Sequence, residues 1–285
     1  MFEGFTLKMI EVSGATLRVR YGGRGKPLLL LHGHPRTHAT WHRVAATLAP
    51  DYFVVCPDLR GFGQSSIPAD MPNHTGSSKR AKALDCIELM QRLGFDRFSV
   101  AGHDRGSYTA FRLAMDHPEA VERLIILDGV PIIEALERCN ANFAKAWWHW
   151  FFFAQLETPE RVINADPETW YKATSQYMGD DAFADFLDAI HNPQTVHGML
   201  EDYRAGVAID HLHDAEDRKN GNRVQSPMLV LWSLKDDLEE LYGDVLGIWR
   251  PWAGASLSGK GLVSGHHMAE EIPEALAAEM KAFLG

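Results

Sequence analysis

The sequence predicts an α/β fold in which helices cover both faces of a mostly parallel β-sheet. Two observations lead to this prediction. Short strand-like runs alternate with helical segments through most of the chain, and most of these runs are apolar without a break. Alternation of this kind is typical of parallel sheets, and continuous apolar character is expected of strands that are covered on both faces. A chain of 285 residues with 46% hydrophobic content is large enough for one such domain with an inserted segment.

The individual strands and helices can be placed along the chain. LKMIEV and ATLRVRYG predict a leading hairpin that turns at Ser13-Gly14. The buried strands expected after it are PLLLLHG (27–33), YFVVCPD (52–58), RFSVAGHD (97–104), ERLIILDG (122–129) and SPMLVLWS (226–233). The helices expected in the core are THATWHRVAATLA, SKRAKALDCIELMQRLG, SYTAFRLAMDH, which should end before Pro118, and the amphipathic terminal segment EEIPEALAAEMKAFLG.

The middle of the chain has a different pattern. Residues 132 to about 222 contain no strand-like run and many aromatic and acidic helical segments, and the strand pattern returns at Ser226. We therefore expect a helical cap at 132–222, inserted between the sixth and seventh strands. The core domain would then consist of residues 1–131 and 223–285.

Composition excludes several classes of partner. The formal charge of −10 argues against nucleic acid or an anionic membrane. The three cysteines are widely spaced and odd in number, which suits a reducing cytosol, and the first residues do not form a signal peptide, so a cytoplasmic location is expected. The apolar tract WWHWFFFA near residue 150 is too short to span a bilayer. The sequence shows no metal-site spacing, P-loop or dinucleotide fingerprint, so we expect neither a metal nor another cofactor.

The segment Gly102-His103-Asp104-Arg105-Gly106 lies between a buried strand and a helix. Gly-x-nucleophile-x-Gly in this context indicates a nucleophile elbow, the sharp strand-to-helix turn of the α/β-hydrolase fold. Asp104 occupies the position of the nucleophile. In this fold the loop after the third strand turns a backbone N–H toward the substrate oxygen. The loop here reads LHGHPRTH, which assigns half of an oxyanion hole to the main chain of His34.

An aspartate at the elbow favours a particular chemistry. Its ordinary pKa is about 4, so it is ionised at neutral pH. Attack on an ester or amide would give an anhydride-like species, whereas displacement at saturated carbon gives an alkyl-enzyme ester. Hydrolysis of that ester needs a histidine to activate water and an acid to orient the histidine. Asp104 therefore predicts cleavage of a carbon–halogen or epoxide bond, although an aspartate here is also a common helix N-cap.

The partners of the nucleophile follow from the chain order nucleophile, acid, histidine that this fold uses. His266, in VSGHHMAEE near the C-terminus, is favoured as the base over His267. Asp128, at the end of the strand beside the elbow strand, is preferred as the acid. Asp236 and Asp237, after the next strand, are the alternative position for this acid.

These motifs together resemble the fluoroacetate dehalogenases, the haloacetate-hydrolysing branch of the α/β-hydrolases. The resemblance runs nearly end to end, through HGHPRTHATWHRVA, DLRGFGQSS, GHDRG, LAMDHP and LDGVP. HG-x-P and DLRG-x-G-x-S are shared by many relatives. The elbow HDRG is far more specific when combined with HW at 149–150 and DYRAG at 202–206, because related haloalkane dehalogenases and epoxide hydrolases typically carry tryptophan after the aspartate.

The resemblance implies hydrolytic release of halide from a small 2-haloacid, by a dimer that needs no cofactor. Asp104 would be the nucleophile, His266 the base and Asp128 its acid partner. Arg105 would bind the substrate carboxylate, which the planar fork of an arginine suits. Three residues of the cap would donate hydrogen bonds to the departing halide: His149, Trp150 and Tyr203.

One position departs from the family. A second arginine normally follows the first by three residues, and here that position is Tyr108. A phenol can donate one hydrogen bond but cannot balance charge, and loss of a charge-assisted hydrogen bond typically costs about 1.5–3 kcal/mol. Arg36, on the oxyanion loop, is a hypothetical substitute. A longer or less charged haloacid is an equal alternative.

Two other functions are compatible with the sequence. An epoxide hydrolase would share Asp104 and His266 but needs cap tyrosines to protonate the epoxide oxygen, for which Tyr171, Tyr177 and Tyr203 are candidates. A non-catalytic binding protein of the same fold is the second alternative. The complete set of nucleophile, base and acid argues for an enzyme.

Overall fold

The structure is a computed structural model that describes residues 1–285. Its eight-stranded sheet has the order β1-β2-β4-β3-β5-β6-β7-β8. The pairs β1–β2 and β2–β4 are antiparallel, and the pairs from β4 to β8 are parallel. The strands are β1 Thr6–Val12, β2 Ala15–Gly23, β3 Lys26–Leu31, β4 Tyr52–Pro57, β5 Phe98–His103, β6 Val121–Leu127, β7 Met228–Ser233 and β8 Leu257–Leu262. The prediction of a mostly parallel α/β sheet is confirmed.

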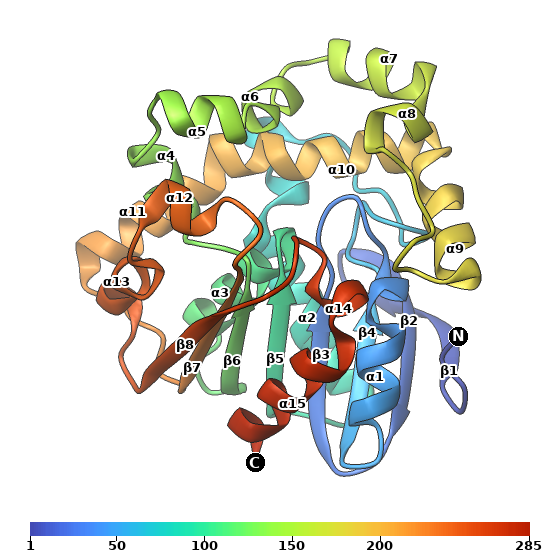
Figure 1. The fold of residues 1–285 in the computed structure, drawn as a ribbon, viewed down its shortest axis with the longest axis vertical. Coiled ribbons are helices and arrows are strands. Elements are labelled where there is room, and N and C mark those ends of the chain that lie inside the picture. The colour runs from blue at the N-terminus through green and yellow to red at the C-terminus, as the bar shows by residue number, and fades with distance from the viewer.

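The helices fall into two groups along the chain. Those outside the segment between β6 and β7 are α1 His42–Leu48, α2 Lys79–Arg92, α3 Arg105–Asp116, α12 Leu238–Tyr242, α13 Val245–Trp249, α14 Met268–Glu271 and α15 Pro273–Leu284. Those between β6 and β7 are α4 Ile132–Glu137, α5 Ala141–Ala146, α6 His149–Phe153, α7 Thr158–Ala165, α8 Pro167–Tyr171, α9 Asp180–Ile190, α10 Pro193–Ala205 and α11 His211–Asn220. Figure 1 shows α1 and α15 on one side of the sheet and α2 and α3 on the other.

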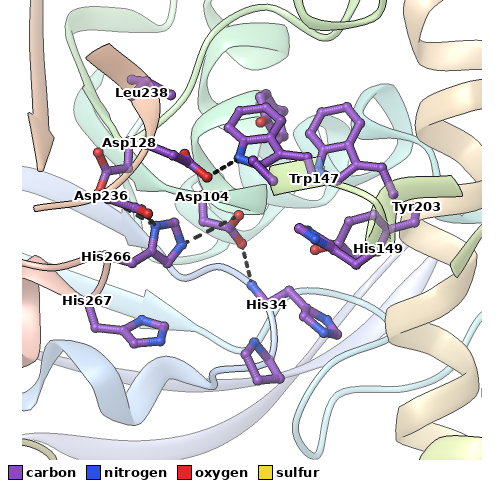
Figure 2. A pocket seen from close by; sticks show the side chains of 15 residues that line it. His34, Asp104, Asp128, Trp147, His149, Tyr203, Asp236, Leu238, His266 and His267 are labelled. Carbon is purple, nitrogen blue, oxygen red and sulfur yellow. Dashed lines mark hydrogen bonds and ion pairs between the residues drawn. The ribbon is translucent and has the colours of Figure 1, made fainter. Parts of the chain in front are cut away.

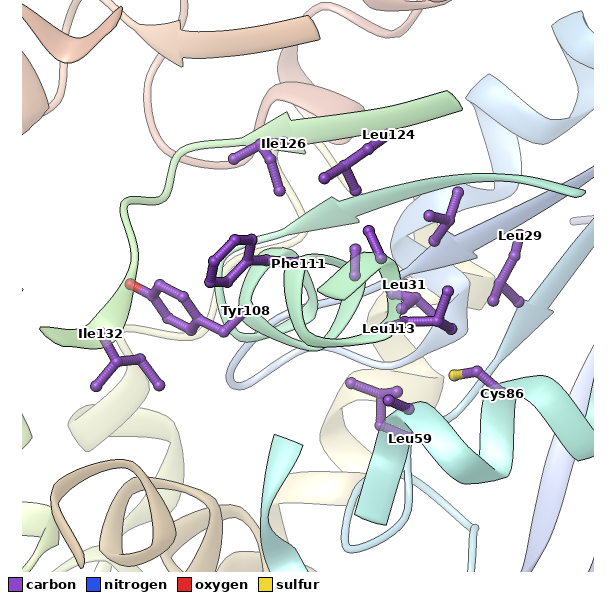
Figure 3. Close-up of a cluster of buried hydrophobic side chains, with 14 of the residues drawn as sticks. Leu29, Leu31, Leu59, Cys86, Tyr108, Phe111, Leu113, Leu124, Ile126 and Ile132 are labelled. Atoms are coloured by element: carbon purple, nitrogen blue, oxygen red, sulfur yellow. The ribbon is translucent and has the colours of Figure 1, made fainter. Parts of the chain in front are cut away.

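The two faces of the sheet are covered by different helices because side chains of a strand alternate between its faces. Leu28 and Leu30 of β3 belong to a buried cluster with α1 and α15, whereas Leu29 and Leu31 belong to a larger cluster with α2 and α3. All four leucines are fully buried. Figure 3 shows part of the larger cluster, in which Leu113 of α3 packs near the leucines of β3. Burial on both faces explains why the strand sequences are apolar without alternation.

The leading hairpin has the predicted turn, since Val12 pairs with Ala15 across Ser13-Gly14. The strands predicted within 27–33, 52–58, 97–104, 122–129 and 226–233 are β3 to β7. The strand β8 was not identified from its sequence, LSGKGL. It pairs only with β7 at the edge of the sheet, and none of its side chains is fully buried. An edge strand with two glycines gives little apolar signal.

The helices α4 to α11 lie over one end of the sheet (Figure 1). No strand occurs between Leu127 and Met228, apart from an isolated bridge at Val224. The helical character expected of the cap is therefore present, while the domain limits 132 and 222 stay a prediction. No helix combines the length and the apolar character that crossing a membrane requires.

Candidate active site

Asp104 stands at the turn between β5, which ends at His103, and α3, which begins at Arg105. Its backbone has φ 51° and ψ −120°, a strained conformation for a residue with a side chain. The turn is tight enough to require glycine at Gly102, where a Cβ would lie 2.2 Å from the carbonyl oxygen of Gly106. The sequence signal for the elbow thus corresponds to a turn that holds the carboxylate out from the end of the sheet.

The carboxylate of Asp104 is held by the loop after β3. The backbone N–H of His34 donates to Asp104 Oδ1 at 2.6 Å. Gly33 allows this approach, because a Cβ there would lie 2.3 Å from the same oxygen. Burial raises the pKa of Asp104, but the charges of His266, His103 and Arg105 and a backbone hydrogen bond outweigh burial and lower that pKa below its ordinary value. Asp104 is therefore ionised at neutral pH.

His266 lies beside Asp104, on the loop after β8, as Figure 2 shows. Its Nε2 is 3.9 Å from Asp104 Oδ2, and its Nδ1 is 2.7 Å from Asp236 Oδ2 and 3.6 Å from Asp128 Oδ2. Burial lowers the pKa of His266, but the hydrogen bond with Asp236 and the charges of Asp128, Asp104 and Asp236 outweigh burial and raise that pKa to about 10. One nitrogen of the imidazole thus faces Asp104, and the other faces the carboxylates of Asp128 and Asp236.

The two candidate acids differ in their surroundings. Asp128, at the end of β6, is buried, and its oxygens accept hydrogen bonds from Ser233 N at 2.7 Å and from Ser233 Oγ at 2.5 Å. Burial raises the pKa of Asp128 to about 6. Burial also raises the pKa of Asp236, but its hydrogen bond with His266 outweighs burial and lowers that pKa. His266 Nδ1 donates its hydrogen bond to Asp236 and not to the preferred Asp128, which lies 3.6 Å from the same nitrogen. The role of the acid stays a prediction.

Asp237, the other alternative, points to the cap. Its Oδ2 accepts a hydrogen bond from Trp147 Nε1 at 2.8 Å. The neighbouring residues Asp236 and Asp237 therefore have different partners: Asp236 bonds His266, and Asp237 bonds Trp147 of the helical segment. Trp147 was not expected at the site, since its sequence, WWHWFFF, indicates only an aromatic face.

A cavity of about 280 Å³ opens above Asp104 and His266. All three predicted halide-binding residues line it: His149 and Trp150 from α6, and Tyr203 from α10. Burial lowers the pKa of His149 to about 4 and raises the pKa of Tyr203 well above its ordinary value. At neutral pH the cap side of the cavity therefore carries uncharged N–H and O–H groups.

Arg105 does not line this cavity. Its Nε donates to Asp202 Oδ2 and its Nη2 donates to Asp202 O at 2.9 Å. Its guanidinium carbon lies 4.0 Å from the ring centroid of Tyr203 and 5.2 Å from that of Trp150. The expectation that Arg105 binds a substrate carboxylate stays a prediction: Asp202 accepts from its Nε and Nη2, whereas its buried Nη1 has no hydrogen-bond partner. Asp202 was missed as a partner, although a buried arginine needs one.

Arg36 also lies outside the cavity lining. Its Nε and Nη2 donate to the two carboxylate oxygens of Glu270 at 2.9 and 3.2 Å, and its guanidinium lies 4.7 Å from the ring of Phe186. The hypothesis that Arg36 replaces the second arginine is not supported, because its fork of donors is already paired. Tyr108, at the substituted position, does line the cavity.

Three sets of side chains lie close enough together to be considered as metal ligands. The first is Asp128, Asp236 and His266, the second is Asp70, His197 and Glu201, and the third is His103, His266 and His267. In the first set Ser233 already donates to both oxygens of Asp128. Its geometry therefore suits a histidine held by carboxylates better than a metal centre.

Comparison with known proteins places the chain in a family. Residues 26–241 match the family described as alpha/beta hydrolase fold. The chain belongs to the α/β-hydrolase family. This α/β hydrolase is 39% identical over 293 residues to the fluoroacetate dehalogenase of a Burkholderia species, covering 100% of the chain and 95% of the relative. The resemblance inferred from the motifs is thereby confirmed.

Two further proteins show the breadth of the family around this hydrolase. A Nostoc sp. PCC 7120 protein, whose crystal structure is described as that of an α/β hydrolase, superposes with a TM-score of 0.94 at 40% identity, covering 100% of this chain and 99% of that one. The soluble epoxide hydrolase of Corynebacterium sp. (strain C12) is 28% identical, over 92% of this chain and 91% of the relative. Carbon–halogen and epoxide chemistry are thus both represented among its relatives.

Proposed function

We propose that this α/β hydrolase releases halide from a small organic halide by hydrolysis, with Asp104 as the nucleophile. The observation that carries the proposal is the ionised carboxylate at the elbow, which faces an imidazole on one side and neutral hydrogen-bond donors on the other. The 2-haloacid implied by the sequence resemblance is the anionic member of this substrate class.

The first step is displacement at the halogen-bearing carbon. One oxygen of Asp104 attacks that carbon and forms a C–O bond, and the carbon–halogen bond breaks with its electron pair leaving as halide. Tyr203, Trp150 and His149 line the opposite side of the cavity, where uncharged donors can stabilise the charge that develops on the halogen. The product of this step is an ester on Asp104.

The second step is hydrolysis of the ester. A water molecule deprotonated by His266 attacks the carboxyl carbon of Asp104, and the negative charge develops on an oxygen of Asp104 itself. The N–H of His34 already donates to Oδ1 of this carboxyl group, so it serves as an oxyanion donor in this step. Collapse of the intermediate breaks the ester bond, and the leaving oxygen takes the proton that His266 removed from water and departs as the alcohol. The carboxyl group of Asp104 then loses its proton to solvent, which restores the carboxylate.

The experiment is a comparison of Asp104→Asn and His266→Asn with the parent enzyme, using fluoroacetate, chloroacetate and chloroacetamide. We expect Asp104→Asn to lose halide release by roughly 10³-fold or more, as loss of a nucleophile does. His266→Asn should release one equivalent of halide and retain the ester, which peptide mass spectrometry would locate on Asp104. Undiminished turnover of all three compounds by Asp104→Asn would rule the proposal out.

Epoxide hydrolysis is the second candidate function. Tyr203 and Tyr108 both line the cavity and offer phenolic O–H groups, which that reaction needs beside the carboxylate. Tyr171, in contrast, does not line the cavity. Formation of a diol from a small epoxide, without halide release from any halide tested, would favour this candidate. A non-catalytic binding role would leave Asp104 free of any ester with both kinds of compound.

A further inference from the structure

The cavity has no permanent cation on its lining. Neither lysine nor arginine contributes to it, and four of its residues are histidines. Burial lowers the pKa of His34 to about 3 and of His149 to about 4, and burial lowers that of His267 well below its ordinary value. These three rings are uncharged at neutral pH. The imidazolium of His266 is therefore the one positive charge that the lining holds.

Carboxylates outnumber that imidazolium. Asp104, Asp128, Asp236 and Asp237 all line the cavity. Asp104 and Asp236 both have pKa values below the ordinary range, so both are ionised at neutral pH. Their combined negative charge exceeds the single positive charge of His266. Asp128, with a pKa of about 6, adds a further negative charge at pH 7 and above. An anionic substrate would enter a cavity that is already negative.

Tyr108 stands where the fluoroacetate dehalogenases normally carry their second arginine, so a buried phenol takes the place of a cation. The residue is 4% exposed and belongs to the large apolar cluster, between Phe111 and Ile132 in Figure 3. Its ring packs edge-on against Trp150, with centroids 5.9 Å apart. Burial raises the pKa of its hydroxyl well above the ordinary value. Tyr108 therefore stays neutral and offers a substrate a hydrogen bond without charge.

Arg105 does not compensate for this substitution. Its Nε donates to the Asp202 carboxylate and its Nη2 to the Asp202 carbonyl oxygen. The same carboxylate accepts from Lys79 at 2.8 Å and from Lys82 at 2.5 Å. The remaining Nη1 has no partner but is buried, and the Tyr108 ring centroid lies 5.1 Å from the guanidinium carbon. The cations of this region are thus held around Asp202, outside the cavity lining.

We infer that the preferred substrate is an uncharged 2-halo compound, such as a 2-haloamide, and not a 2-haloacid anion. This inference rests on the dehalogenation proposed above. For chloroacetamide, Asp104 displaces chloride from the CH₂ carbon, and water hydrolyses the resulting ester to glycolamide. The net reaction consumes one water and yields glycolamide, chloride and a proton. The amide accepts and donates hydrogen bonds as a carboxylic group does, but it adds no negative charge beside Asp104.

The test is the matched pair chloroacetamide and chloroacetate, measured as kcat/KM for chloride release. Each value is divided by the uncatalysed rate of that compound with acetate, because a carboxylate also lowers intrinsic reactivity. The assay uses a Cys139→Ser background, since Cys139 is an exposed thiol that chloroacetamide can alkylate, whereas Cys56 and Cys86 are buried. We expect the normalised value for the amide to exceed that for the acid by about tenfold or more, the scale of one lost charge-assisted hydrogen bond.

Two variants of Tyr108 sharpen the test. Tyr108→Arg should shift the normalised preference toward chloroacetate by about tenfold, while the matched control Tyr108→Phe keeps the preference for the amide. If Tyr108→Arg does not fold, the ratio of the parent enzyme decides alone. A normalised preference of the parent enzyme for chloroacetate overturns this inference and leaves the proposed dehalogenation standing. Absence of both chloride release and an ester on Asp104 with either compound overturns the proposed function, and this inference with it.

Discussion

The two walls of the cavity differ in the charged groups that they carry. The wall formed by the core carries Asp104, Asp128, Asp236 and His266, whereas the wall formed by α5, α6 and α10 carries aromatic rings and no ionised group at neutral pH. Charge on the core wall is compensated by fixed donors, such as His34 N for Asp104 and Ser233 N for Asp128. The helical wall offers only neutral donors. Such a wall can stabilise a charge that develops during the reaction, but it cannot balance one that the substrate already carries.

The largest effect should come from the two acids of the core wall. Asp236 bonds His266 Nδ1, and Asp128 lies 3.6 Å from the same nitrogen, so either carboxylate can hold the imidazolium when the other is replaced. We expect Asp236→Asn and Asp128→Asn each to slow ester hydrolysis by about tenfold, and the double variant to slow it by about 10³–10⁴-fold. Decay of the ester on Asp104 in single turnover measures this step.

The single variants also decide between the acids. If one of them alone loses as much as the double variant, the acid function belongs to that residue and not to the pair. Formation of the ester should be nearly unchanged in both, since Asp104 does not depend on them for its position. A slowed first step would indicate a general disturbance of the core wall.

On the helical wall, Tyr203→Phe removes one donor without changing charge. We expect the first step to slow by about 10²-fold, as removal of an oxyanion-hole donor does. The loss should be larger for fluoride than for bromide, because fluoride accepts the stronger hydrogen bond. Tyr242→Phe is a matched control, since Tyr242 also has a buried hydroxyl but does not line the cavity. Equal losses in both variants would assign the effect to packing.

The smallest effect concerns pH. His266 acts as a base only when deprotonated, and its pKa of about 10 in the free enzyme reflects three neighbouring carboxylates, which favour its charged form. Ester formation removes the charge of Asp104, so the pKa of His266 falls and hydrolysis should become faster as pH rises through that lower value. Asp236→Asn removes another negative charge and should shift the rising limb to lower pH by about 1 unit or more. A shift to higher pH would show that Asp236 does not stabilise the imidazolium.

The sequence predicted the site most reliably where the structural cause is local. The elbow required glycine at Gly102 because the turn allows no Cβ there. Strands covered on both faces required continuous apolar runs, so β3 to β7 were identified. The strand β8 was missed because it lies at the edge of the sheet and pairs only with β7. Its side chains are therefore only partly buried, and its sequence shows little apolar pattern. The family resemblance predicted three further residues, His149, Trp150 and Tyr203. They line one cavity although α6 and α10 are far apart in the chain.

The sequence by itself therefore determined the fold class, the strained turn at Asp104 and the histidine late in the chain. Only the tertiary structure decided which charges face each other. The chain has 38 acidic residues, and neither spacing nor periodicity tells which of them pairs with a given cation. Arg105 bonds Asp202, 97 residues away, and His266 bonds Asp236 in preference to Asp128. Electrostatic partners are set by distances of a few ångströms between remote segments, and those distances exist only after the chain has folded.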